Sequence, residues 1–168
     1  RGEAGTHMSV EAIAECSTNH GGSLALAKEF IHAFAPYVET IKFQLTRVAH
    51  LRPQDPQYEW FKRAELTLDQ FAELKAECQK VEVGFLLTAY NAVDGWEVVE
   101  LGCSCVKIGS GEANEWDLAR AVLQAKLDPL ISCGIHYPGY IDSPWQPGYH
   151  EMGDYYTTAQ LEHYTFLG

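Results

Sequence analysis

Short apolar runs alternate along this chain with longer stretches in which apolar residues recur every three or four positions. The apolar runs lie at residues 12–16, 39–45, 83–88, 103–108 and 129–133. Their near-continuous apolar character is typical of strands buried on both faces of a parallel sheet. Helices are predicted between them at 23–35, 58–66, 67–78, 91–101 and 114–124. Because such alternation implies parallel strands joined by right-handed crossovers, the pattern predicts an α/β fold.

Two helix starts carry specific capping residues. Ser23 precedes the first helical stretch, and Thr67 is followed three residues later by Gln70, as in a capping box. After Gly134 the alternation ends, and the remaining segment is rich in proline and tyrosine, with one short helix expected at 157–164. We therefore expect a tag remnant at 1–8, an α/β unit at 9–134 and an irregular tail at 135–168.

Composition narrows the classes of function. The 168 residues are 46% hydrophobic and carry a net charge of -11, which argues against nucleic-acid binding through phosphates. An anionic ligand would therefore need a local cluster of lysine or arginine. No apolar run approaches the roughly 20 residues of a membrane span, and no signal peptide is visible. The five cysteines lie mostly in or beside apolar strands, which suits buried free thiols and a cytoplasmic protein.

Polar residues gather where the predicted strands end. In parallel α/β folds the carboxyl ends of the strands form the binding rim. The residues expected there are, in chain order, Glu15, Asn19, His20, Lys42, Gln44, Thr88, Tyr90, Asn91, Lys107, Ser110, Glu112 and Ser132. Two lysines on one rim of an acidic protein indicate an anionic ligand.

Several of these residues allow a structural role as well. Lys42 and Lys107 lie within apolar strands, where a lysine is costly unless it is paired, and this favours function. Glu15 suits a salt bridge to either lysine as much as a catalytic role. His20 suits a turn as much as a ligand contact, and Glu112 suits a helix N-terminus as much as proton transfer.

Six motifs in order resemble the sialic acid (N-acetylneuraminate) synthase family over about residues 11–134. They are Ile13-Ala14-Glu15, Asn19-His20-Gly21-Gly22, Ile41-Lys42-Phe43-Gln44, Phe85-Leu86-Leu87-Thr88, Val106-Lys107-Ile108-Gly109-Ser110-Gly111-Glu112 and Leu130-Ile131-Ser132-Cys133-Gly134. The segment Tyr58-Glu59-Trp60-Phe61-Lys62, continuing to Glu65-Leu66, also resembles the family. The resemblance implies a TIM barrel that condenses phosphoenolpyruvate with an N-acetylated amino-sugar such as N-acetylmannosamine. It also implies a divalent metal, manganese or magnesium.

The resemblance also assigns roles to the residues of the rim. Glu15, Lys107 and Glu112 would be catalytic, and His136 would ligate the metal. The substrate-binding residues would be Asn19, His20, Lys42, Gln44, Thr88, Ser110 and Ser132. The enol carbon would attack the metal-polarised sugar aldehyde, water would add at the cationic centre, and phosphate would leave.

The chain departs from the family in its length. A full barrel has eight strands, whereas about five to six βα units plus a tail are visible here, so the TIM-barrel-like fold is expected to be incomplete. His136-Tyr137-Pro138 directly follows the fifth strand, like a shortened form of the family's sixth-strand metal motif. Phe166-Leu167-Gly168 lies about where a seventh strand would begin.

These departures leave alternatives to an active synthase. One is a catalytically inactive, truncated relative that acts as a ligand-binding or assembly module. A related sugar-phosphate synthase is disfavoured by Asn19-His20-Gly21-Gly22 and Lys42-Phe43-Gln44. Because a partial barrel has open sheet edges, we also expect a homo-oligomer, or a tail that covers an edge.

Overall fold

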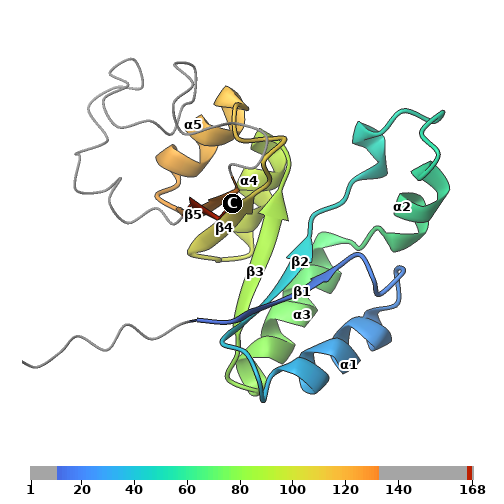
Figure 1. Ribbon diagram of the computed structural model, residues 1–168, viewed down its shortest axis with the longest axis vertical. Coiled ribbons are helices and arrows are strands. Elements are labelled where there is room, and N and C mark those ends of the chain that lie inside the picture. Colours follow the sequence, from blue (N-terminus) through green and yellow to red (C-terminus); the bar gives the residue numbers. More distant parts are fainter. Residues whose placement is uncertain (1–10, 133–165, 168) are drawn as a thin grey trace, which may run out of the picture.

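One parallel sheet organises the molecule. The computed structural model describes residues 11–132 and 166–167 (Figure 1). Each strand pairs in parallel with the next one along the chain. The strands are β1 (Ile13–Ser17), β2 (Thr40–Gln44), β3 (Gly84–Ala89), β4 (Cys105–Ile108), β5 (Asp128–Ser132) and β6 (Phe166–Leu167). The predicted α/β architecture is confirmed, with the strand order of a (β/α) barrel.

Helices connect the first five strands. They are α1 (Leu24–Phe34), the 3-10 turn η1 (Val48–His50), α2 (Tyr58–Ala64), α3 (Leu68–Lys80), α4 (Ala92–Glu100) and α5 (Trp116–Gln124). Ser23 caps α1, and Thr67 with Gln70 forms the predicted capping box at α3. The fourth strand and α5 each begin two residues later than predicted, and η1 lies between the predicted strand at 39–45 and the predicted helix at 58–66.

The two faces of the sheet differ in character. Side chains that point toward the helices, such as Ile41, Phe43 and Val106, are fully buried in the core. The expectation that the strands are apolar on both faces holds only in part. The opposite face carries Lys42 and Lys107 among its residues, in register with leucines of β3 and β5. The predicted site residues that lie within β1 to β5 project from this mixed face.

The tail contributes a strand to this sheet. Phe166 pairs with Ile131 and Leu167 with Ser132, so β6 lies directly beside β5. The expectation that this segment lies where a seventh strand begins is therefore wrong, because β6 takes the sixth position. The predicted helix at 157–164, His136 and the expected tag at 1–8 lie outside the described residues. Oligomerisation and the proposed domain division stay predictions.

The expectation of buried free thiols holds in part for the described cysteines. Cys16, Cys78, Cys103 and Cys105 are free thiols, and the first two are buried. Burial raises the pKa of Cys16 to about 11, so its reactive thiolate form is suppressed at neutral pH. Within the described residues, no helix is both long and apolar enough to cross a membrane.

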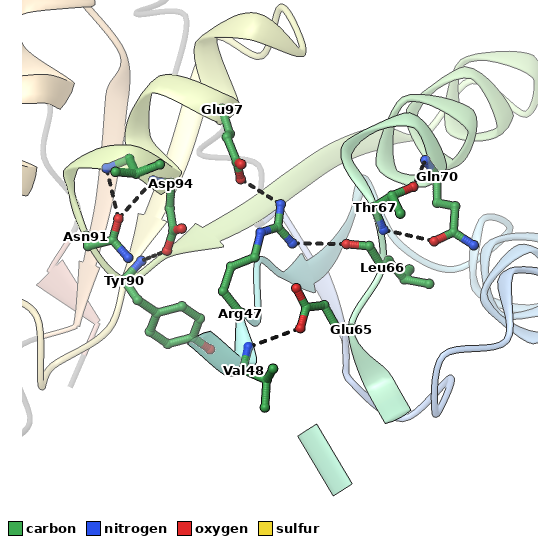
Figure 2. Close-up of polar contacts among 11 residues, drawn as sticks. Arg47, Val48, Glu65, Leu66, Thr67, Gln70, Tyr90, Asn91, Asp94 and Glu97 are labelled. Carbon is green, nitrogen blue, oxygen red and sulfur yellow. Dashed lines mark hydrogen bonds and ion pairs between the residues drawn. The ribbon is translucent and has the colours of Figure 1, made fainter. Parts of the chain in front are cut away.

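Arg47 holds the long connection between β2 and α3 in place through hydrogen bonds and an ion pair. Its Nη1 donates to the carbonyl of Leu66 at 3.0 Å, and its Nη2 lies 2.7 Å from Oε2 of Glu97 in α4 (Figure 2). Beside it, the Val48 N–H donates to Oε2 of Glu65 at 3.1 Å. These bonds close the base of the segment that carries η1 and α2. They also tie the carboxyl end of β2 to α4.

We expect Arg47→Ala to lower the free energy of unfolding by about 2 kcal/mol, because it removes two charge-assisted hydrogen bonds in a largely buried setting. Urea denaturation measures the change. Arg120→Ala is the matched control, since the ion pair of Arg120 with Asp117 is exposed and should contribute less than about 0.5 kcal/mol. Equal losses in the two variants would contradict this role for Arg47.

Candidate functional site

The strand register brings six of the predicted site residues onto one face of the sheet. Paired residues of parallel strands project to the same side. Glu15 is in register with Lys42, and Thr88 is in register with both Gln44 and Lys107. The side chain of Lys107 in turn reaches Ser132 on β5. This set, which we call the polar face, consists of Glu15, Lys42, Gln44, Thr88, Lys107 and Ser132.

Lys107 is the most buried charge of the polar face, with 6% of its surface exposed. Its Nζ donates to Oγ of Ser132 at 2.6 Å and to the carbonyl of Ile108 at 2.5 Å. The neighbouring Thr88 is also buried, and its hydroxyl has no hydrogen-bond partner among the described residues. An ammonium flanked by two hydroxyls, one of them unsatisfied, is chemically suited to hold an anionic oxygen.

Lys42 is held differently, by an ion pair with Glu15. Its Nζ lies 2.5 Å from Oε2 of Glu15. The other carboxylate oxygen of Glu15 accepts the N–H of Ser17 at 2.9 Å. A register shift between Glu15 and Ser17 marks a β-bulge, and Ser17 adopts a left-handed conformation with φ 49°. This bulge turns the end of β1 so that one carboxylate meets both a backbone N–H and the lysine.

Two further ionisable groups, Glu112 and Tyr90, interact electrostatically with residues of this face. Burial raises the pKa of Glu112, and the charge of Lys107 opposes that rise in part. The pKa of Tyr90 is raised by burial and also by the negative charges of Glu112 and Glu15. Glu112 therefore has a greater tendency to hold a proton than an exposed glutamate.

The sequence placed Tyr90 on the rim but gave it no individual role. Its backbone N–H donates to Oδ2 of the buried Asp94 at 2.8 Å, while Asn91 caps α4 through the N–H groups of Val93 and Asp94 (Figure 2). The start of α4 thus fixes the backbone of Tyr90, the residue that follows β3. The signal in the sequence was an aromatic residue directly between a strand and an Asn cap.

The loop after β1 holds the remaining predicted residues of that strand end. His20 is buried, packs near Phe43 with ring centroids 6.1 Å apart, and accepts the Gly22 N–H on Nδ1 at 3.1 Å. Burial lowers the pKa of His20, so its neutral form is favoured. His20 therefore stabilises the turn through its hydrogen bond with Gly22, and its contact with a ligand stays a prediction. Asn19 is exposed, and Ser110 lies half-buried in the turn after β4.

The described residues do not fit a metal centre. They contain no group of three or more histidine, cysteine, aspartate or glutamate residues that could hold an ion. His136, the predicted ligand, lies outside them. What the polar face offers is two ammonium groups, three hydroxyl or amide side chains and two nearby carboxylates, which suits an anion and proton transfer.

Comparison with known proteins identifies the family. The model of the NeuB family matches residues 32–146. The chain belongs to the NeuB family. Among its NeuB relatives, an N-acetylneuraminate-9-phosphate synthase of Drosophila melanogaster is 30% identical over 142 residues, which are 76% of this chain and 38% of that protein. An N,N'-diacetyllegionaminic acid synthase of Legionella pneumophila is 27% identical over 147 residues, 78% of this chain and 41% of that protein.

The fold of this NeuB chain matches that of a solved relative. The N-acetylneuraminic acid synthetase from Leptospira borgpetersenii, solved in complex with citrate, superposes with a TM-score of 0.70 at 28% identity. The match covers 74% of this chain and 45% of that one. The predicted TIM-barrel-like α/β fold and the predicted family are thus confirmed. The chain spans less than half the length of these relatives.

Proposed function

We propose that this NeuB-family chain forms the phosphoenolpyruvate-binding part of a synthase that condenses phosphoenolpyruvate with an N-acetylated amino-sugar. The observation that carries the proposal is the buried Lys107, bonded to Ser132 and beside the unsatisfied hydroxyl of Thr88. The relative from Leptospira supports an anion site, because its structure holds citrate, itself a polyanion. The names of the other relatives support a nine-carbon sugar acid as the class of product.

The spacing of the two lysines suits a ligand with two anionic ends. Lys42 and Lys107 lie on strands separated by β3 and are offset by two residues in register. With strands about 4.8 Å apart and a rise of about 3.3 Å per residue, their Cα atoms lie about 12 Å apart. Because each side chain reaches about 6 Å, the ammonium groups can converge on a compact molecule. Phosphoenolpyruvate is such a compact molecule, and it carries two anionic groups, a phosphate and a carboxylate.

The proposed chemistry uses the residues of the polar face and Glu112. Lys107 and Ser132 hold the phosphate and stabilise its charge as the bond between carbon and the phosphate oxygen breaks. The enol carbon attacks the sugar aldehyde, whose oxygen takes up a proton. Water adds at the carbon that bore the phosphate. In this proposal Glu112, whose pKa is raised by burial, supplies the proton that the aldehyde oxygen takes up.

The test is phosphate release from phosphoenolpyruvate in the presence of N-acetylmannosamine and manganese. We expect release that depends on all three components. Glu112→Gln should lower the release rate by about 100-fold or more while phosphoenolpyruvate binding, measured by calorimetry, changes less than about threefold, because only the proton transfer is removed. Binding without release in the unaltered chain would support instead the inactive ligand-binding module. Absence of both would reject the proposal.

A further inference from the structure

Lys42, one of the two cations of the proposed anion site, already forms an ion pair with Glu15. Only 13% of the Lys42 side chain is exposed, compared with 45% of the Glu15 side chain. The lysine is therefore held in the sheet, with the carboxylate on its solvent side. A ligand that approaches Lys42 from solvent meets this carboxylate first.

We propose that Glu15 is an internal counter-anion, which neutralises Lys42 in the ligand-free protein and is displaced from it by an anionic group of the incoming ligand. The inference rests on the proposed anion site and deepens it, because it concerns how that site selects its ligand. The step is an exchange of ion-pair partners, in which no covalent bond changes.

The geometry at the end of β1 allows this exchange. Glu15 holds two partners with two different oxygens: Oε2 faces Lys42, and Oε1 accepts the Ser17 N–H at 2.9 Å. A carboxylate that leaves Lys42 therefore keeps a backbone hydrogen bond, and its exposed side is solvated. Lys42 can follow the ligand, because an ammonium on a four-carbon stem adjusts its direction more readily than a planar guanidinium.

Lys107 and Lys42 differ in their bonding partners, and this difference determines which ligands the exchange favours. Lys107 donates to the Ser132 hydroxyl and the Ile108 carbonyl, which carry no net charge. These two partners are neutral, whereas the partner of Lys42 is the carboxylate of Glu15. A ligand with a single anionic group gains little by displacing Glu15. A ligand with two such groups binds Lys107 with one and competes for Lys42 with the other.

The experiment compares phosphoenolpyruvate affinity, measured by calorimetry at low ionic strength, in the unaltered chain and in Glu15→Gln. We expect the affinity to rise about fivefold in the variant, because every molecule then offers an unoccupied Lys42. Glu73→Gln is the matched control. It changes the net charge equally and breaks the 2.8 Å ion pair of Glu73 with Lys28 on the helical side, so its affinity should stay within about twofold.

A double-mutant cycle assigns the effect to Lys42. In a Lys42→Met background, Glu15→Gln should give no gain in affinity. If Glu15→Gln fails to fold, Glu15→Asp serves instead, because the shorter side chain draws the carboxylate away from Lys42 and should also raise affinity. Unchanged or weaker binding in a folded Glu15 variant, or a gain that persists without Lys42, would overturn the exchange. If the unaltered chain and all variants fail to bind, the proposed function falls with it.

Discussion

Replacing Lys107 with methionine should lower the affinity for phosphoenolpyruvate by about 30-fold or more. The ammonium of Lys107 is buried, and a charge-assisted hydrogen bond to a ligand in such a setting contributes about 1.5–3 kcal/mol. Methionine keeps the length and the apolar stem but provides no charge. Calorimetric titration with phosphoenolpyruvate measures the loss.

The same substitution should leave the fold nearly as stable as before. A buried lysine carries a desolvation cost that methionine does not, which offsets the lost bonds to Ser132 and Ile108. We therefore expect the free energy of unfolding to change by no more than about 1 kcal/mol. Lys28→Met, which removes an exposed ion pair on α1, is the control for net charge and should bind normally. If Lys107→Met bound as tightly as Lys28→Met, the anion site would lie elsewhere.

A stable variant that no longer binds would also explain why this lysine lies in a strand. Burying a lysine carries a desolvation penalty. If its removal does not destabilise the fold, its role is to bind the ligand. Lys42 is in a different position, because its charge is already compensated by Glu15. Substitutions of the two lysines should therefore have different effects, although both lysines lie in similar apolar runs of the sequence.

Local pattern was enough to predict most of the elements. The ends of β2, α1, α3 and α4 fall within about two residues of their predicted positions, because apolar periodicity and the caps at Ser23 and Thr67 act over a few neighbouring residues. The two strand lysines were found by the same reasoning, since a charge in an apolar run stands out locally.

Features that depend on partners distant in sequence were not predictable in this way. Arg47 has no distinctive neighbours, and its role arises from contact with Glu97, fifty residues later. The position of β6 depends on its pairing with β5 across the tail. For His20, the sequence gives its place after a strand but not the direction of its ring. Its burial against Phe43 is decided by tertiary packing.

Gly22→Ala should be the most destabilising of the single substitutions considered, with a loss of about 3 kcal/mol or more in the free energy of unfolding. Gly22 has φ +86°, and a Cβ at this position would overlap the backbone carbonyl oxygen of Arg63 at the end of α2. Backbone cannot move aside as a flexible side chain can. The substitution therefore combines the cost of a left-handed residue with displacement of α2.

The neighbouring glycine provides the matched control for this prediction. Gly21 also has a left-handed φ, +55°, but a Cβ there would meet nothing within 4 Å. Gly21→Ala should thus cost only the conformational term, about 1 kcal/mol. The difference between the two variants in urea denaturation isolates the contact between the loop after β1 and α2. Equal losses would mean that α2 moves freely, and that the second glycine serves only the turn. A larger loss for Gly22→Ala would show that this loop, with Asn19 and His20, is positioned by α2 as well as by β1.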